Sequence, residues 1–242
     1  MAIRPSFPSI YRPFAVTEDL DPFDQGILMA KEDVEVGTLL WSARDEICEC
    51  AIVLAPEKPR EESLPVMLVA MLGLGDALGA LVPPVVAVTF SWPDRIEVNG
   101  GVVGGIRMAI AETPNPTAVP DWLVLGFSVA NKGGWRRDRR DGRHRTTLVE
   151  EGCVIDPLDL LESFSRHFLA WVNRWQSDGI QPVQQAWISR APEVGKEIEI
   201  DGQGRRGTFT GLDERGGLEL VHRGRHQVVP LDHVVMAPTW SL

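Results

Sequence analysis

The sequence predicts an α+β fold in which a mixed or antiparallel sheet is packed against helices and is followed by a small C-terminal SH3-like β-barrel. Several central segments are apolar on both faces, as a sheet covered by helices requires. After Pro192 the chain changes to short alternating runs separated by glycine-rich turns, which is typical of a small barrel. We therefore expect two domains, at 1–192 and 193–242, and expect the small one to lean on the larger because its own core is marginal.

The first third of the chain contains two short strands and one apolar helix. Residues 37–42 and 51–54 are short and rich in strand-forming residues. The segment from Ser63 to Leu81 is Ala-, Leu- and Met-rich, with Ser63 as an N-cap, and Pro83-Pro84 ends it. Its three internal glycines cost roughly 1 kcal/mol each relative to alanine. We therefore expect this helix to lie close against the sheet.

The middle of the chain supplies the remaining strands of the main sheet. The segments VVAVTF, IRMAIAE and WLVLGFSVAN follow one another from Val85, with a hairpin between the first two. An arginine-rich stretch, 136–145, then carries six arginines and cannot be core. We interpret it as a solvated loop, with contact to an acidic partner as the alternative.

A second amphipathic helix is predicted after Asp156-Pro157 and is expected to end at Gly179. Apolar residues recur along it at three- and four-residue intervals and form one buried face. These residues are Leu160, Leu161, Phe164, Phe168, Trp171 and Trp175. A shorter helix is predicted in PVQQAWISRA.

Composition restricts the classes of partner. The formal net charge of -10 disfavours nucleic acid and the membrane surface, because binding to either depends on clustered lysine and arginine. The start of the chain has no apolar signal run, and no stretch approaches the ~18 apolar residues of a membrane span. These features predict a cytoplasmic protein with neither a nucleic-acid nor a membrane partner.

Metal, redox and common hydrolytic sites find little support. Three cysteines do not make a disulfide framework, and the period of two places Cys48 and Cys50 on one strand face. We interpret both as structural, with metal or redox function as the alternative, and predict no metal site. The chain also lacks the phosphate-loop, HExxH and GxSxG motifs.

The segment SWPDRIEVNGGVVGGI, residues 91–106, reads as a hairpin with its turn at Asn99-Gly100-Gly101. Trp92-Pro93 suits either strand-entry packing or the wall of a pocket. Gly104 and Gly105 allow either close backbone packing or a ligand lying across the strand. Asp94 and Arg95 are adjacent on the expected strand, so we expect them to point to opposite faces.

This hairpin resembles that of biotin and lipoate protein ligases, which have Lys-Trp-Pro-Asn-Asp, a hydrophobic strand, a Gly-Arg-Lys turn and a small-Gly-hydrophobic ending. In this chain the four parts correspond, in the same order, to residues 91–95, 96–98, 99–102 and 104–106. Gly126-Phe127-Ser128-Val129 falls where the family has Gly-Ile-Gly-Ile-Asn, and 146–148 falls at its Thr-Ser-Leu. The order of elements also agrees, so the resemblance covers roughly 15–240.

The resemblance implies an enzyme that activates biotin or lipoate with ATP and Mg²⁺ as an acyl-adenylate and transfers the acyl group to a lysine of a carrier protein. Members of this family often pair through sheet edges, which makes a homodimer an expectation here. The residues it places at the ligand are Trp41, Arg44, Ser91, Trp92, Asp94, Arg95, Gly104, Gly105 and Ile106. No catalytic residue is assigned.

The chain departs from the family where the triphosphate would bind. The glycine- and arginine-rich loop is replaced by WSARDEICEC, which has one arginine, Arg44, and no glycine. The turn lysine aligns with Val102, the lysine before Trp-Pro with Ser91, and the asparagine ending the central strand with Ala130. A valine cannot stabilise developing negative charge.

We therefore expect a protein that binds a small organic acid or an acyl-nucleotide in its cleft, with ATP-dependent activation lost or altered. It would act as a binder, a regulator or an acyltransferase that uses a preformed donor. One alternative is an active ligase in which Arg95 replaces the lysine, and Arg44 or Arg107 could also supply charge. The other is an interaction module whose cleft is closed by Trp41 and Trp92. If Gly105 lines the ligand site, Gly105→Val should abolish binding at little cost in stability.

Overall fold

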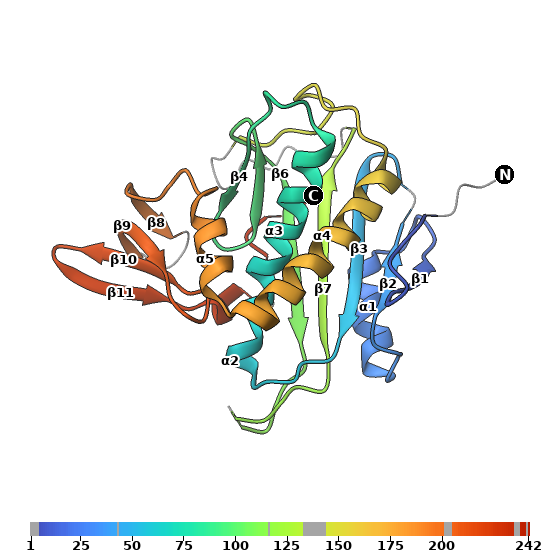
Figure 1. Cartoon of the computed structure of the whole chain (residues 1–242), viewed down its shortest axis with the longest axis horizontal. Coiled ribbons are helices and arrows are strands. Elements are labelled where there is room, and N and C mark those ends of the chain that lie inside the picture. Colours follow the sequence, from blue (N-terminus) through green and yellow to red (C-terminus); the bar gives the residue numbers. More distant parts are fainter. Residues whose placement is uncertain are drawn as a thin grey trace.

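A computed structural model describes residues 5–42, 44–115, 117–132, 144–200, 205–234, 238–240 and 242. Its described part contains a seven-stranded sheet with the order β1-β2-β3-β7-β6-β5-β4 (Figure 1). The strands are β1 (Arg12–Ala15), β2 (Thr38–Trp41), β3 (Ile47–Leu54), β4 (Val88–Ser91), β5 (Arg95–Val98), β6 (Gly101–Ile110) and β7 (Leu123–Ala130). β1 pairs with β2 in parallel and the other neighbours are antiparallel. The predicted mixed sheet of an α+β fold is therefore confirmed.

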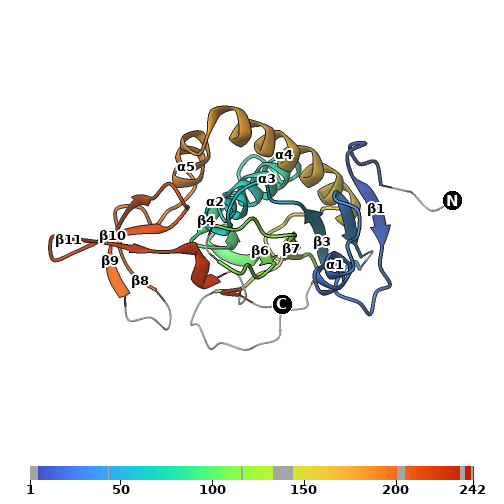
Figure 2. The same ribbon diagram turned by 90° about the horizontal axis from the view of Figure 1, so that it is seen from below.

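Helices cover the two faces of this sheet unequally. Helices α3 (Val66–Leu81), α4 (Pro157–Asp178) and α5 (Gln181–Ile188) lie together on one face. The ten-residue helix α1 (Pro22–Lys31) packs on the other face against β3 and β7. Figure 2 shows α3 and α4 on one side of the sheet and the C-terminal end of the chain on the opposite side. The face that carries α1 is thus only partly covered by helix.

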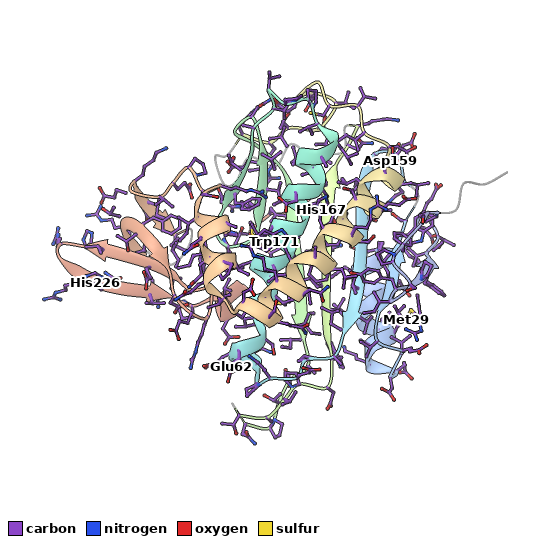
Figure 3. All side chains as sticks on the ribbon, in the orientation of Figure 1. Met29, Glu62, Asp159, His167, Trp171 and His226 are labelled. Atoms are coloured by element: carbon purple, nitrogen blue, oxygen red, sulfur yellow. The ribbon has the colours of Figure 1, made fainter. Side chains whose placement is uncertain are left out.

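The main core lies between the sheet and the pair α3 and α4. Leu160, Leu161, Phe164 and Phe168 of α4 are buried as the periodicity predicts, whereas Trp171 and Trp175 are partly buried. The Asp156 carboxylate accepts the Leu158 N–H at 2.9 Å, and the helix ends at Gly179. Figure 3 labels Trp171 where α4 crosses α3, and its indole N–H donates to Asp76 of α3 at 2.6 Å. The predicted boundaries of this helix are confirmed.

Helix α3 differs from its prediction in its start and in the role of its glycines. A short helix, α2 (Arg60–Ser63), precedes it, so Ser63 ends one helix instead of capping the next. A Cβ on Gly73 would lie 2.9 Å from the Cα of Phe168 in α4, and one on Gly75 would meet the ring of Phe90 in β4. Gly79 faces open space. Close approach to the sheet therefore explains only one of the three glycines.

The segment Arg60–Leu81 is also as long and apolar as a membrane-spanning helix, with a mean hydropathy of 1.9 over its best window. This contradicts the expectation that no stretch of the chain reaches that length. Because 78% of the window is buried inside the fold, the segment has the character of a core helix.

A second, four-stranded antiparallel sheet follows, with the order β11-β10-β9-β8. Its strands are β8 (Glu197–Ile200), β9 (Arg205–Leu212), β10 (Leu218–His222) and β11 (Arg225–Val229), and a 3-10 turn follows at Leu231–Val234. Figure 3 places His226 toward the end of this sheet that is farther from the main sheet. The small C-terminal sheet is confirmed, and the SH3-like barrel stays a prediction. Of the arginine-rich stretch, only His144 and Arg145 lie within the described residues.

Candidate functional site

The hairpin β5–β6 has the predicted turn. Asn99 and Gly100 both have positive φ, at 50° and 83°, as the tightest two-residue hairpin requires. Further along β6, Gly104 has φ +152°, and a Cβ there would lie 2.0 Å from the Ser128 carbonyl oxygen. Only glycine fits at that position, because both the backbone conformation and the adjacent strand exclude a side chain.

Gly105 faces two different neighbours. A Cβ there would lie 2.0 Å from the Asp94 carbonyl oxygen and 2.4 Å from the indole nitrogen of Trp240. The backbone contact contradicts the expectation that Gly105→Val would cost little stability. The Trp240 contact shows that the bare backbone of β6 is covered by a residue close to the end of the chain.

The remaining residues that the family resemblance places at the ligand make contacts within the protein instead. The Trp92 indole N–H donates to the Gly216 carbonyl of the small-sheet region at 3.1 Å, and the Ser91 hydroxyl donates to Glu97 at 2.6 Å. Ile106 belongs to the main core, and Trp41 packs against that same core. These four side chains are absent from the lining of the cavity described below.

Asp94 and Arg95 both hold Thr239, which lies close to the end of the chain. The Thr239 N–H donates to the Asp94 carboxylate at 2.8 Å, and its hydroxyl donates to the other carboxylate oxygen. The Arg95 Nε donates to the Thr239 carbonyl at 3.1 Å. The expectation of opposite faces is therefore wrong, because Asp94 lies in the turn before β5 and so outside the alternation of the strand.

Asp94 is fully buried, and this changes its acidity. Burial raises the pKa of its carboxyl group to about 6 from 3.8, although the hydrogen bonds from Thr239 and the charge of Arg95 act in the opposite direction. The contact with Thr239 is therefore made by a carboxylate that titrates in mildly acidic solution.

Next to this contact, on the face that carries α1, lies a cavity of about 340 Å³. Its walls come from the residues just before α1, from the residues before and within β3, from β6 and β7, and from residues near the end of the chain. The lining residues are Asp19, Asp21, Arg44, Ile47, Glu49, Arg107, Ser128, Pro238, Trp240 and Leu242. Of the residues that the family resemblance places at the ligand, Arg44 is the one that lines this cavity.

Arg107 is the most firmly held cation of the cavity. Its guanidinium donates two hydrogen bonds of 2.7 Å to Asp21 and one of 3.3 Å to Ser128, and it stacks 4.6 Å above the ring of Phe23. Asp21 also caps α1 by accepting the Phe23 N–H at 2.8 Å. Burial acts to raise the pKa of Asp21, but Arg107 and the backbone donors bring it below its ordinary value. The Asp21 carboxyl group is therefore ionised at neutral pH.

A second ion pair, between Arg44 and Glu49, also lines the cavity. Glu49, in the middle of β3, accepts hydrogen bonds from Arg44 and from the Ser42 hydroxyl, the latter at 3.0 Å. Arg44 lies just before β3, and its side chain lines the cavity. The lining therefore holds three carboxyl side chains and two guanidinium groups, and both guanidinium groups are paired with carboxylates.

Three buried donors of the lining find no acceptor among the described residues. Within the described part of the chain, no hydrogen-bond partner meets the Nε of Arg44, the Nε of Arg107 or the indole nitrogen of Trp240, and all three atoms are buried. A buried donor without an acceptor costs about 1–3 kcal/mol. This lining therefore suits a molecule that brings acceptor oxygens.

Sequence reasoning missed Asp21, Glu49 and Trp240, which lie far from the hairpin in the chain. Arg107 could be located from the hairpin alone, since it shares a strand face with Gly105 two residues earlier. Glu49 carried a weaker signal, as a lone acid between two buried cysteines of β3. No local pattern points to Trp240.

Comparisons with known proteins agree on the family. The model of the biotin/lipoate A/B protein ligase family matches residues 7–189. A biotin–[acetyl-CoA-carboxylase] ligase of Paracoccus denitrificans is 28% identical over 188 residues, which are 76% of this chain and 77% of that protein.

Solved structures show the same fold. A biotin protein ligase-like protein of unknown function from Silicibacter sp. TM1040 is 33% identical, with a TM-score of 0.87 over 96% of this chain and 100% of that one. The biotin protein ligase of Aquifex aeolicus, at 19% identity, gives a TM-score of 0.73 over 90% of this chain and 96% of its own. The family match spans most of the chain, from β1 through α5, and on it we conclude that the protein belongs to the biotin/lipoate A/B protein ligase family.

Proposed function

We propose that this protein binds a small organic acid or its acyl derivative in the cavity beside β6, and that it does not activate the acid with ATP in the manner of the family's ligases. The observation that carries the proposal is a pair of buried N–H donors, the Nε groups of Arg44 and Arg107, that find no acceptor within the described residues. A carboxyl or acyl oxygen that accepts from them would remove their desolvation cost.

The size of the cavity supports a small ligand. Small-molecule sites range from about 300 to 1,000 Å³, and 340 Å³ lies at the lower end of that range. With Trp240 in place as a wall, this volume suits an acid and leaves little room for a nucleotide beside it.

The residues present do not fit Mg-ATP. The described lining carries three carboxyl side chains against two guanidinium groups, a net charge of minus one, and both cations are already paired. A triphosphate needs unpaired cations or backbone N–H groups aimed at it. Val102, which aligns with the family's turn lysine, is buried and supplies no charge.

The test is a thermal-shift titration with biotin, lipoate and octanoate, alongside ATP–pyrophosphate exchange with each acid. An acid at 100 times its Kd adds about 2.7 kcal/mol, which is roughly 5 to 10 °C in a chain of this size. We expect such a shift with one of the acids, nearly none with Mg-ATP, and no acid-dependent exchange. Exchange that depends on the acid would instead identify an active ligase with a rearranged site.

A matched pair of variants locates the binding. Arg44→Gln removes a cavity donor, and Arg12→Gln removes an exposed arginine that pairs with Glu35 at the sheet edge. The shift should shrink in the first variant and persist in the second. Equal shifts in both would place the ligand elsewhere.

Several further features stay proposals. A carrier protein would receive the acyl group if transfer is retained, and pairing of two chains through a sheet edge would form a homodimer. A cytoplasmic location, the absence of nucleic-acid and membrane partners, and a domain boundary near Glu193 remain predictions from the sequence.

A further inference from the structure

Residues 238–240 and 242, which we call the tail, follow the small sheet in sequence and lie against the main sheet. Thr239 and Trp240 lie against β5 and β6, about 145 residues away in sequence, and Pro238 and Leu242 line the cavity beside them. They lie beyond residue 189, where the match to the family model ends. The tail thus covers the hairpin on which the family resemblance rests.

Two residues engage the three polar groups of Thr239: Asp94 in the turn before β5 and Arg95 at the start of β5. Its N–H and hydroxyl both donate to the Asp94 carboxylate, and its carbonyl accepts from Arg95. Asp94 and Arg95 are two of the residues that the family resemblance places at the ligand. A ligand that uses them has to displace Thr239.

Trp240 occupies the space above the bare backbone of β6. Its indole nitrogen would lie 2.4 Å from a Cβ on Gly105, and the side chain is only 5% exposed. The same indole forms part of the cavity wall. Trp240 thus borders both the surface above Gly105 and the cavity, which we together call the groove along β6.

Trp240 is buried, but its hydrogen-bonding capacity is not satisfied. Within the described residues its indole N–H finds no acceptor, whereas a buried tryptophan N–H usually has one. By contrast, Trp92 in the core and Trp171, which packs against the core, each donate to an oxygen. Trp240 is therefore less well satisfied in place than the tryptophans that hold the fold together.

We propose that Thr239 and Trp240 form a removable plug, which closes the groove along β6 in the ligand-free protein and competes with a ligand for Asp94, Arg95 and the surface above Gly105. The identity of the competing ligand rests on the proposed function, but the docking of the plug does not. The protein would thus be autoinhibited by its own tail, and its apparent affinity would equal the intrinsic affinity reduced by the fraction of molecules with an open groove.

The docked plug can be tested without any ligand. In protein labelled with 5-fluorotryptophan, the eight tryptophans give separate ¹⁹F NMR signals, and Trp240→Phe identifies the relevant one. We expect that signal to be shielded from a soluble paramagnetic quencher in the wild type. It should become accessible in Asp94→Ala, which removes both acceptors of Thr239, and partly accessible in Thr239→Val, which removes the hydroxyl alone. An accessible signal in the free wild type would overturn the plug.

Competition is tested with biotin, lipoate and octanoate as probes, by calorimetry on the wild type and on a chain that ends at Pro238. If the groove is closed in at least 90% of wild-type molecules, the shortened chain should bind about tenfold more tightly or better. Trp240→Ala should reproduce this effect in a full-length chain. Trp175→Ala, on α4 across the sheet, should not. In the wild type, saturation with the probe should expose the Trp240 signal.

Two results separate the plug from the proposed function. Weaker binding by the shortened chain would show that the tail is a wall of the ligand site, and would overturn the plug. If neither chain binds any of the three acids, the proposed function fails, and the quenching of Trp240 in the free protein alone decides whether the tail closes the groove.

Discussion

At the scale of single residues, Asp94 shows how burial and hydrogen bonding oppose one another. Its folded pKa of about 6 exceeds the ordinary 3.8, so the folded state binds a proton more readily than the unfolded chain. The favourable contribution of this group is complete below about pH 4 and disappears as the pH rises through 6. The difference corresponds to as much as about 3 kcal/mol.

The variant Asp94→Asn tests this balance. The amide keeps an acceptor for the Thr239 N–H and gains a donor for its hydroxyl, while the buried charge is gone. We expect the variant to exceed the wild type in free energy of unfolding above pH 6, with the gap narrowing towards pH 4. Urea denaturation at four pH values between 4 and 7 measures this, with Asp121→Asn as the exposed control. A gap that widens as the pH falls would contradict it.

Single residues also show where the sequence is informative. Asn99-Gly100 and Asp156 were identified because a turn and a helix cap depend on near neighbours. The sequence indicates that Gly105 matters but does not show why a glycine is needed there. The carbonyl of Asp94 and the indole of Trp240 come close to Gly105 only in the folded chain. The ion pairs of the cavity could not be predicted from the sequence for the same reason. Arg107 and Asp21, for example, are 86 residues apart.

At the scale of elements, the glycines of α3 make different contributions along one helix. Gly73 sits where α3 packs directly against the backbone of α4, and a Cβ there would meet the Cα of Phe168 at 2.9 Å. Gly79 is exposed, with nothing within 4 Å. Helix propensity favours alanine at both positions by about 1 kcal/mol, but overpacking against backbone costs about 1–3 kcal/mol.

The two alanine variants should therefore differ in sign. We expect Gly73→Ala to lower the free energy of unfolding by up to about 2 kcal/mol, and Gly79→Ala to raise it by up to about 1 kcal/mol. Chemical denaturation of both proteins at one pH measures the two changes. Stabilisation by Gly73→Ala would show that α4 moves aside without loss.

Among the strands, β3 runs further than its sequence predicted. It begins at Ile47, although only 51–54 was expected, because Glu49 interrupts the apolar pattern. That carboxylate is nevertheless buried, since it faces the cavity and pairs with Arg44. Cys48 and Cys50, on the other face, join the main core, so the prediction of one shared face is confirmed. A charged residue that lines a cavity can therefore interrupt the apolar pattern by which a strand is recognised in the sequence.

At the scale of the whole molecule, Trp187 of α5 joins the two sheets. Its ring lies 5.9 Å from that of Phe90 in β4 and 6.3 Å from that of Phe209 in β9, and its indole N–H points to the Met71 sulfur at 3.2 Å. Both sheets therefore contribute to one continuous core. A shared core of this kind couples the unfolding of its parts.

We expect the described fold to unfold in one transition, with fluorescence and far-UV circular dichroism giving coincident curves. Trp187→Ala should lower the free energy of unfolding by about 3–5 kcal/mol and shift both curves together. Trp175→Ala, at the partly exposed end of α4, should cost less. Separate melting of the small sheet in the wild type would show that the two sheets are energetically independent.

The position of Leu242 affects how the protein is handled in the laboratory. Because this residue lines the cavity and follows Thr239 and Trp240, any purification tag or fusion partner attached after it starts beside the groove. Such an attachment would compete for the space above β6 or pull Trp240 away from it. Recombinant protein tagged at the other end of the chain, which enters the sheet at the far edge strand β1, leaves that space to the native residues.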